Sequence, residues 1–232
     1  MTPSRNSTLS AFVAFVAAGG VAVLAAAVMQ WETDEFGLIL ALAGLAVFFE
    51  FFDFAPFPNS RVSLSVAAII AAAAVGGFTG VAVVGSASVA AQYTAHRKPF
   101  MKVAFNEGTL LLSGAAAVGA FEAFGTGYGS TAWPGVLAPA LAAGAAFFAI
   151  NSGLVAIAIS IDKSANVFRV WSEAFAWLTP HYVLVGVIAV TMATASDEWG
   201  LVGTGLPLVP LAMIWLIVRQ GPLRPQTSDA SA

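Results

Sequence analysis

The chain has 232 residues, of which 59% are hydrophobic and only 9% are charged, and its mean hydropathy is +0.88. A soluble domain carries roughly 25% charged residues, so this chain cannot cover a water-facing surface. Its net charge of −3 offers no basic field for nucleic acid, and the absence of cysteine excludes disulfides and thiolate metal sites. Composition therefore excludes a soluble enzyme, a nucleic-acid-binding protein and a disordered chain, and predicts an integral membrane protein.

Long apolar segments follow one another along the chain. A helix needs about 20 apolar residues to cross a bilayer core of about 30 Å, and runs such as residues 66–75 lack the alternation of a transmembrane barrel strand. We therefore predict an all-α polytopic membrane bundle with a single transmembrane domain over residues 1–218 and a short disordered cytoplasmic tail over residues 219–232. Its eight predicted segments are residues 9–30, 36–54, 62–77, 80–95, 103–124, 136–161, 174–195 and 201–218.

The charges predict an orientation. With this segmentation all 9 Lys and Arg residues fall on one side of the membrane. On the opposite side the charged loop residues are all acidic, at positions 32, 34, 35, 197 and 198. By the positive-inside rule both termini are cytoplasmic.

The third and fourth segments are short and are joined by a glycine-rich turn. Two full spans and a re-entrant hairpin would both leave the outer ends on the cytoplasmic side, and we expect two full spans. Gly76 and Gly80, four residues apart, would allow close helix packing, although such pairs arise by chance in a chain rich in Ala and Gly. Between Asp162 and Glu173 we predict a short helix in the membrane interface, with Lys163 at headgroup level.

Polar residues inside apolar segments are costly in lipid and so indicate structural contacts or function. Asn151 lies about 15 Å from the inner end of its segment, near the bilayer midplane. His181 follows Pro180, which removes a backbone N–H and is expected to kink the segment and leave the carbonyl of Ala176 unpaired. Together with Thr179 these residues predict a polar pocket, with purely structural hydrogen bonding as the alternative.

Three carboxylates form a second set of candidates. Glu50 and Asp53 share a helix face because they are three residues apart. We expect a structural ion pair with Arg61; a cation or proton site and a partner-binding site are the alternatives. Glu107 follows Asn106 near the start of its segment, where an acidic residue complements the helix dipole.

Catalytic motifs are absent from the sequence. It contains no nucleophile elbow, zinc-protease helix, phosphate-binding loop or dinucleotide fingerprint. No lysine lies inside a predicted segment, which excludes a retinal Schiff base. Only one of the two histidines lies inside a segment, which argues against haem or a metal site. We therefore predict no catalytic residue, metal or cofactor, and a protein that is not an enzyme.

Two stretches resemble a known family. The first comprises Pro58-Asn59-Ser60-Arg61-Val62-Ser63-Leu64-Ser65, the turn at 76–80, Arg97-Lys98-Pro99 and Phe105-Asn106-Glu107. The second comprises Asn151-Ser152-Gly153, Val170-Trp171-Ser172-Glu173 and Trp177-Leu178-Thr179-Pro180. This order, over residues 58–186, resembles the multi-pass membrane domain found N-terminal to bacterial HD-type phosphohydrolases and diguanylate cyclases.

The resemblance implies a sensor in the bacterial cytoplasmic (inner) membrane, with Asn106 and Asn151 as its polar positions. A short tail without an output domain follows Arg219, so we expect any signal to pass to a separate protein.

These observations predict a non-enzymatic, sensor-like module that binds a small apolar or amphipathic ligand between its helices. Its expected partners are the lipid bilayer and a cytoplasmic or membrane protein, without nucleic acid. The predicted ligand-binding residues are Asn106, Asn151, Thr179 and His181. The alternatives are a small-molecule transport component (a substrate-binding subunit or a small carrier) and a structural subunit of a larger membrane complex. The coupling groups of a carrier would be Glu50, Asp53 and Glu107.

Overall fold

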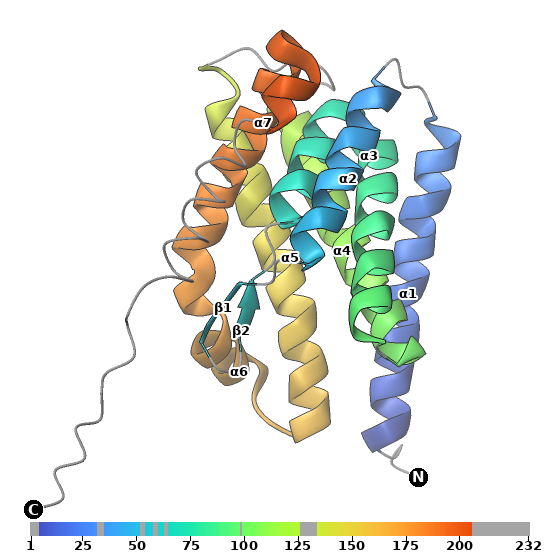
Figure 1. The fold of residues 1–232 in the computed structure, drawn as a ribbon. Helices are drawn as coiled ribbons and strands as arrows, with labels where there is room; N and C mark the ends of the chain where they lie inside the picture. Colours follow the sequence, from blue (N-terminus) through green and yellow to red (C-terminus); the bar gives the residue numbers. More distant parts are fainter. Residues whose placement is uncertain are drawn as a thin grey trace, which may run out of the picture.

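The computed structural model describes residues 5–31, 35–51, 54–57, 60–62, 65–97, 99–125 and 134–205. These residues form a helical bundle with one short β-hairpin (Figure 1). The elements are α1 (Arg5–Met29), α2 (Phe36–Phe51), β1 (Phe54–Phe57), β2 (Ser60–Val62), α3 (Ser65–His96), α4 (Phe100–Ala123), α5 (Leu137–Lys163), α6 (Val167–Ala174), the 3₁₀ turn η1 (Ala176–Leu178) and α7 (Thr179–Gly205).

The prediction of a helical bundle is confirmed, and several of its helices are long and apolar enough to cross a membrane. Within the described part of the chain, four helical stretches are long and apolar enough to cross a membrane: Asn6–Met29, Ser65–Ala95, Phe100–Ala123 and Leu137–Lys163. The predicted segments 62–77 and 80–95 both lie within α3. The predicted segment 201–218 falls almost wholly outside the described residues.

Helix α3 is not straight but folds back on itself at Gly77. This residue has φ 53° and ψ −135°, a conformation that only glycine adopts readily. The hydroxyls of Ser65 and Ser88 lie 2.6 and 2.7 Å from the same oxygen of Glu50, whereas a straight helix would hold them about 35 Å apart. The two arms, residues 65–76 and 78–96, are therefore antiparallel.

The first arm of α3 forms the centre of the bundle. Every residue from 65 to 74 is buried, and α3 as a whole contacts α1, α2, α4, α5 and α7. A helix that is apolar on all sides is stable only where other helices or lipid surround it. With 12 residues the arm is about 18 Å long, which is too short to cross a bilayer core of about 30 Å. The expectation of two full spans is therefore not supported, and the re-entrant alternative fits these lengths.

A hairpin interrupts the chain between α2 and α3. The predicted helix over residues 36–54 ends at Phe51, and β1 pairs antiparallel with β2, with Phe54 opposite Val62. Pro56 lies in β1 and Pro58 follows it; proline lacks an N–H and disfavours helix in the residue before it. The sequence analysis did not predict this hairpin.

The short helix predicted between Asp162 and Glu173 is present as α6. Asn166 caps it by accepting hydrogen bonds from the backbone N–H groups of Phe168 and Arg169. The predicted kink at Pro180 is wrong, because α7 begins at Thr179 and places the proline in its first turn, where no backbone N–H is needed. The carbonyl of Ala176 is also not left unpaired, since it accepts the hydroxyl of Thr179 at 2.8 Å.

Two pairs of helices approach closely at facing glycines. A Cβ added to Gly20 of α1 would lie 2.7 Å from the Cα of Gly108 in α4. In the same way, a Cβ on Gly186 of α7 would lie 2.5 Å from the carbonyl oxygen of Ala140 in α5. These contacts hold α1 against α4 and α5 against α7.

Candidate functional site

A cavity of about 220 Å³ lies between α3, α4, α5 and α7. Most of its lining residues are polar but carry no formal charge. They are Ser65, Val66, Gln92, Asn106, Thr109, Leu110, Asn151, Val155 and Tyr182. Since a water molecule occupies about 30 Å³ in the liquid, the space would hold a group of roughly seven water volumes.

The fold-back of α3 explains why so many polar side chains meet here. It brings Ser65, the first residue of α3, beside Gln92, which lies near its end. The amide of Asn106 in α4 donates a hydrogen bond to the side-chain oxygen of Gln92 at 3.1 Å. Asn151 enters from α5, so the structure brings the two asparagines of the predicted site to one cavity.

One buried polar group in this cavity lacks a hydrogen-bond partner among the described residues. Thr109 is only 3% exposed, and its hydroxyl has no partner. Other helical hydroxyls in the bundle, such as those of Ser113 and Ser152, donate to the carbonyl four residues earlier. Asn151, which is half-buried, lines the same cavity. Because an unsatisfied buried polar group costs about 1–3 kcal/mol, the Thr109 hydroxyl favours a bound molecule that would satisfy it.

Tyr182 forms the wall contributed by α7. Its ring lies 4.8 Å from the ring of Phe148 and stacks on Phe147 with a centroid distance of 6.5 Å. The close contact at Gly186, one helical turn further along α7, leaves no room between the α5 and α7 backbones. The cavity is therefore closed on this side by packed aromatic rings.

Glu50 is held beside the cavity rather than in it. It is 3% exposed, and its Oε1 accepts hydrogen bonds from Ser65 and Ser88, one from each arm of α3. Ser65 begins α3, so the carboxyl group also lies at the positive end of that helix dipole. Of the predicted ion pair, Asp53 lies outside the described residues and the side chain of Arg61 is not described.

The remaining predicted residues lie elsewhere or are only partly described. Glu107 is half-buried and accepts a hydrogen bond from Ser86 at 2.5 Å. Thr179 is exposed at the start of α7 and does not line the polar cavity. His181 lies in the first turn of α7, where only its backbone is described.

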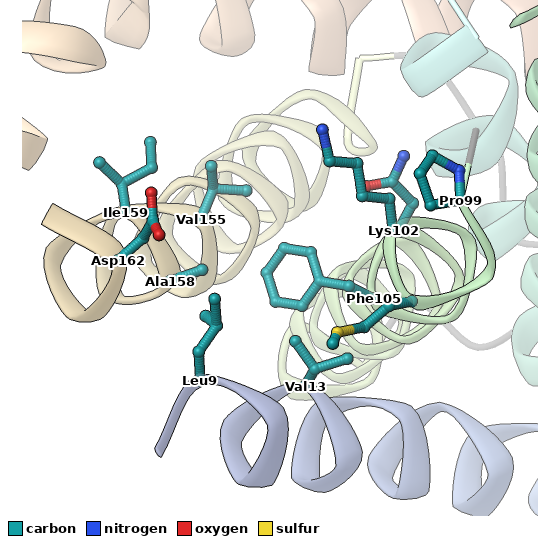
Figure 2. A pocket seen from close by; sticks show the side chains of 11 residues that line it. Leu9, Val13, Pro99, Lys102, Phe105, Val155, Ala158, Ile159 and Asp162 are labelled. Atoms are coloured by element: carbon teal, nitrogen blue, oxygen red, sulfur yellow. The ribbon is translucent and has the colours of Figure 1, made fainter. Parts of the chain in front are cut away.

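A second, larger cavity of about 550 Å³ opens between α1, α4 and α5. Figure 2 shows Leu9 and Val13 rising from α1 and Phe105 projecting from α4 towards Val155 and Ala158 of α5. Its walls are mainly apolar, with the charged groups of Lys102 and Asp162 among the lining. The full lining is Leu9, Val13, Pro99, Met101, Lys102, Phe105, Asn106, Val155, Ala158, Ile159 and Asp162.

Helix α6 is attached to the helix that carries Asn151. The indole N–H of Trp171 donates to the hydroxyl of Ser152 at 2.8 Å, and its ring packs on Phe148. On the exposed side of α6, Arg169 donates to Glu173 at 2.8 Å, and this hydrogen bond raises the pKa of the Arg169 guanidinium above its ordinary value. Adjacent residues of α5 thus face the cavity and hold α6.

Replacing Trp171 with Phe is expected to loosen α6 while leaving the bundle intact. The substitution removes the indole donor but keeps an aromatic ring against Phe148, so the loss should be about 1 kcal/mol, the worth of one hydrogen bond. Amide hydrogen exchange should become faster in α6 and stay unchanged in α3. Faster exchange throughout the bundle, or an unchanged exchange rate in α6, would contradict this role.

Four cavity residues were not identified from the sequence. Ser65 and Thr109 do not stand out, because Ser and Thr occur widely in helices as local backbone donors, and no pattern in the sequence singles out Gln92 or Tyr182. The signal that could have found Thr109 is its spacing of three residues from Asn106, which places both on one helix face.

No known family model, curated protein or solved structure matches the chain. The resemblance to membrane domains of bacterial signalling proteins therefore stays a prediction, and the argument for function rests on the cavity.

Proposed function

We propose that this chain is a non-enzymatic membrane module that binds a small molecule in the polar cavity and acts through a separate protein partner. The observation that carries the proposal is the unsatisfied, buried hydroxyl of Thr109, which lines the same cavity as the amide of Asn151. Both are hydrogen-bonding and uncharged, so the bound molecule would supply donors and acceptors without a formal charge.

The attachment of α6 to α5 supports transmission of ligand binding to a protein partner. Asn151 lines the cavity and its neighbour Ser152 holds Trp171 of α6. A ligand that rotates or tightens α5 would therefore change the position of α6. The side chain of Phe168 in this helix is 80% exposed, which leaves an apolar group for the membrane interface or a partner.

The membrane arrangement is part of the proposal. The start of α1, the junction of α3 with α4 and the end of α5 lie together at one end of the bundle, which carries Arg97, Lys102 and Lys163 (Figure 1). By the positive-inside rule this end faces the cytoplasm. We place the protein in the bacterial inner membrane, with the first arm of α3 entering the bundle without crossing it.

Native mass spectrometry of the protein in lipid nanodiscs prepared from its own membrane tests this function. The wild-type chain is expected to retain one discrete small molecule. Replacing Asn151 with Leu removes a donor and an acceptor and should reduce occupancy by about tenfold, which corresponds to 1.4 kcal/mol.

Asn6→Leu is the matched control, because it is the same substitution at an exposed position near the start of α1. It should retain the molecule fully. A wild-type chain that carries no discrete molecule, or an Asn151→Leu variant that carries it unchanged, would overturn the proposal.

A further inference from the structure

The polar cavity and the apolar cavity adjoin. Asn106 and Val155 line both of them, so these two side chains form the shared boundary between α4 and α5. The smaller space is lined mostly by hydrogen-bonding groups and the larger one mainly by aliphatic and aromatic groups. A single molecule with a polar head and an apolar chain would match this order of surfaces.

We infer that the ligand is a single-chain amphiphile with an uncharged, hydrogen-bonding head, bound with its head in the polar cavity and its chain in the apolar cavity between α1, α4 and α5. This inference rests on the proposed function, since it assigns a ligand class to the same site.

The lining of the polar cavity sets the charge of the head. Its described residues include Asn106, Thr109 and Asn151 but no Asp, Glu, Lys or Arg. An unpaired ion in such a space would lose its hydration without gaining a counter-charge. Glu50 lies one hydrogen bond beyond Ser65, and its carboxyl group would further disfavour an anionic head. Hydroxyl or amide groups on the head would satisfy both the Thr109 hydroxyl and the Asn151 amide.

The second cavity indicates where the apolar chain of the ligand would lie. Its volume of about 550 Å³ falls within the range of roughly 300–1,000 Å³ that is usual for small-molecule sites. Phe105, Val155 and Ala158 offer a continuous apolar path from the shared boundary (Figure 2). The path leads towards Lys102 and Asp162, at the end of the bundle that carries the basic residues.

Photo-crosslinking tests the ligand class. The probe is 1-oleoylglycerol with a diazirine in the middle of its acyl chain, added to the full chain in lipid nanodiscs. Cross-links are expected at Phe105, Val155 or Ala158. Excess unlabelled 1-oleoylglycerol should remove them, whereas glycerol, which lacks the chain, and oleate, which carries a charged head, should not.

Two substitutions test the binding of the ligand's head group and of its acyl chain separately. Asn151→Leu removes hydrogen bonds to the head group, and Ala158→Trp fills the part of the apolar cavity that the acyl chain would occupy. Each substitution is expected to lower labelling by about tenfold. Ala145→Trp is the matched control, because it adds the same ring at an exposed position of α5. It should label like the wild-type chain.

The outcomes distinguish this inference from the proposed function. Labelling that depends on Ala158 but not on Asn151, equal competition by oleate, or labelling spread over all lipid-facing helices would overturn the amphiphile assignment. If the discrete molecule seen by native mass spectrometry still depends on Asn151, the proposed function stands without this inference. If neither the molecule nor the labelling depends on Asn151, both fail.

Discussion

Replacing Gly80 with alanine is expected to destabilise the bundle strongly. A Cβ at this position would overlap the carbonyl oxygen of Ala72 and lie 2.8 Å from its carbonyl carbon. Both contacts are with backbone of the opposite arm, which is buried on all sides and cannot move aside. Overpacking a core costs about 1–3 kcal/mol where side chains can adjust, and here we expect a loss at or above that range.

Thermal unfolding followed by tryptophan fluorescence in detergent micelles measures this loss. Gly119→Ala is the matched control, because Gly119 is exposed in α4 and a Cβ there meets nothing within 4 Å. It should leave the stability unchanged or raise it by about 0.5–1 kcal/mol. An unfolding midpoint for Gly80→Ala equal to that of the control would mean that the two arms are not in backbone contact.

The absence of cysteine allows an independent check of the same fold-back. Cysteines placed at positions 65 and 88 should be joined by a short bifunctional thiol cross-linker, because both wild-type hydroxyls reach one oxygen of Glu50. In a straight helix these positions would be about 35 Å apart and no such cross-link could form.

Glu50→Leu is expected to produce the second large loss of stability. Leucine offers no acceptor to the hydroxyls of Ser65 and Ser88, so two buried hydrogen bonds are lost. A hydrogen bond contributes about 0.5–1.5 kcal/mol, or about 1.5–3 kcal/mol where one partner is charged, so the expected loss of unfolding free energy is roughly 1–6 kcal/mol. The same unfolding measurement applies.

Two further variants identify the cause of that loss. Glu50→Gln keeps an oxygen acceptor and nearly the same shape, so it should lose much less stability than Glu50→Leu. Glu173→Leu removes a carboxylate from an exposed pair with Arg169, and exposed pairs contribute only about 0–1 kcal/mol. A Glu50→Leu variant as stable as Glu173→Leu would show that the serine contacts do not hold the two arms together.

Much of the helical architecture could be predicted from apolar segment lengths. Residues 103–124 and 136–161 correspond closely to α4 and α5. Two features could not be predicted from the apolar segments alone: the short first arm of α3 and the position of Pro180. Residues 62–77 are apolar enough to face lipid but too few to cross it, and the burial of residues 65–74 inside the bundle is a tertiary property. Pro180 was placed inside a segment because the preceding residues are apolar, yet Val167–Ala174 form a separate helix before it.

The candidate site was predictable only in part. Asn106 and Asn151 stand out because an amide is rare and costly inside an apolar segment. Their meeting at one cavity depends on the crossing of α4 and α5. The inclusion of Ser65 and Gln92 depends on the reversal at Gly77, which brings residues from opposite ends of α3 together. Neither contact follows from the spacing of residues along the chain.

The contacts of Glu50 have a consequence for the order in which the protein assembles during synthesis. Glu50 accepts hydrogen bonds from Ser65 and Ser88, and both of these contacts can form as soon as α3 has left the ribosome. The wall provided by Tyr182 is made much later. At the usual translation rate of about 5–20 residues per second, Tyr182 is added roughly 2–6 seconds after Asn151, the polar lining residue that precedes it. A hydrogen-bonding lipid that enters during this interval would be enclosed by the last helix as it inserts.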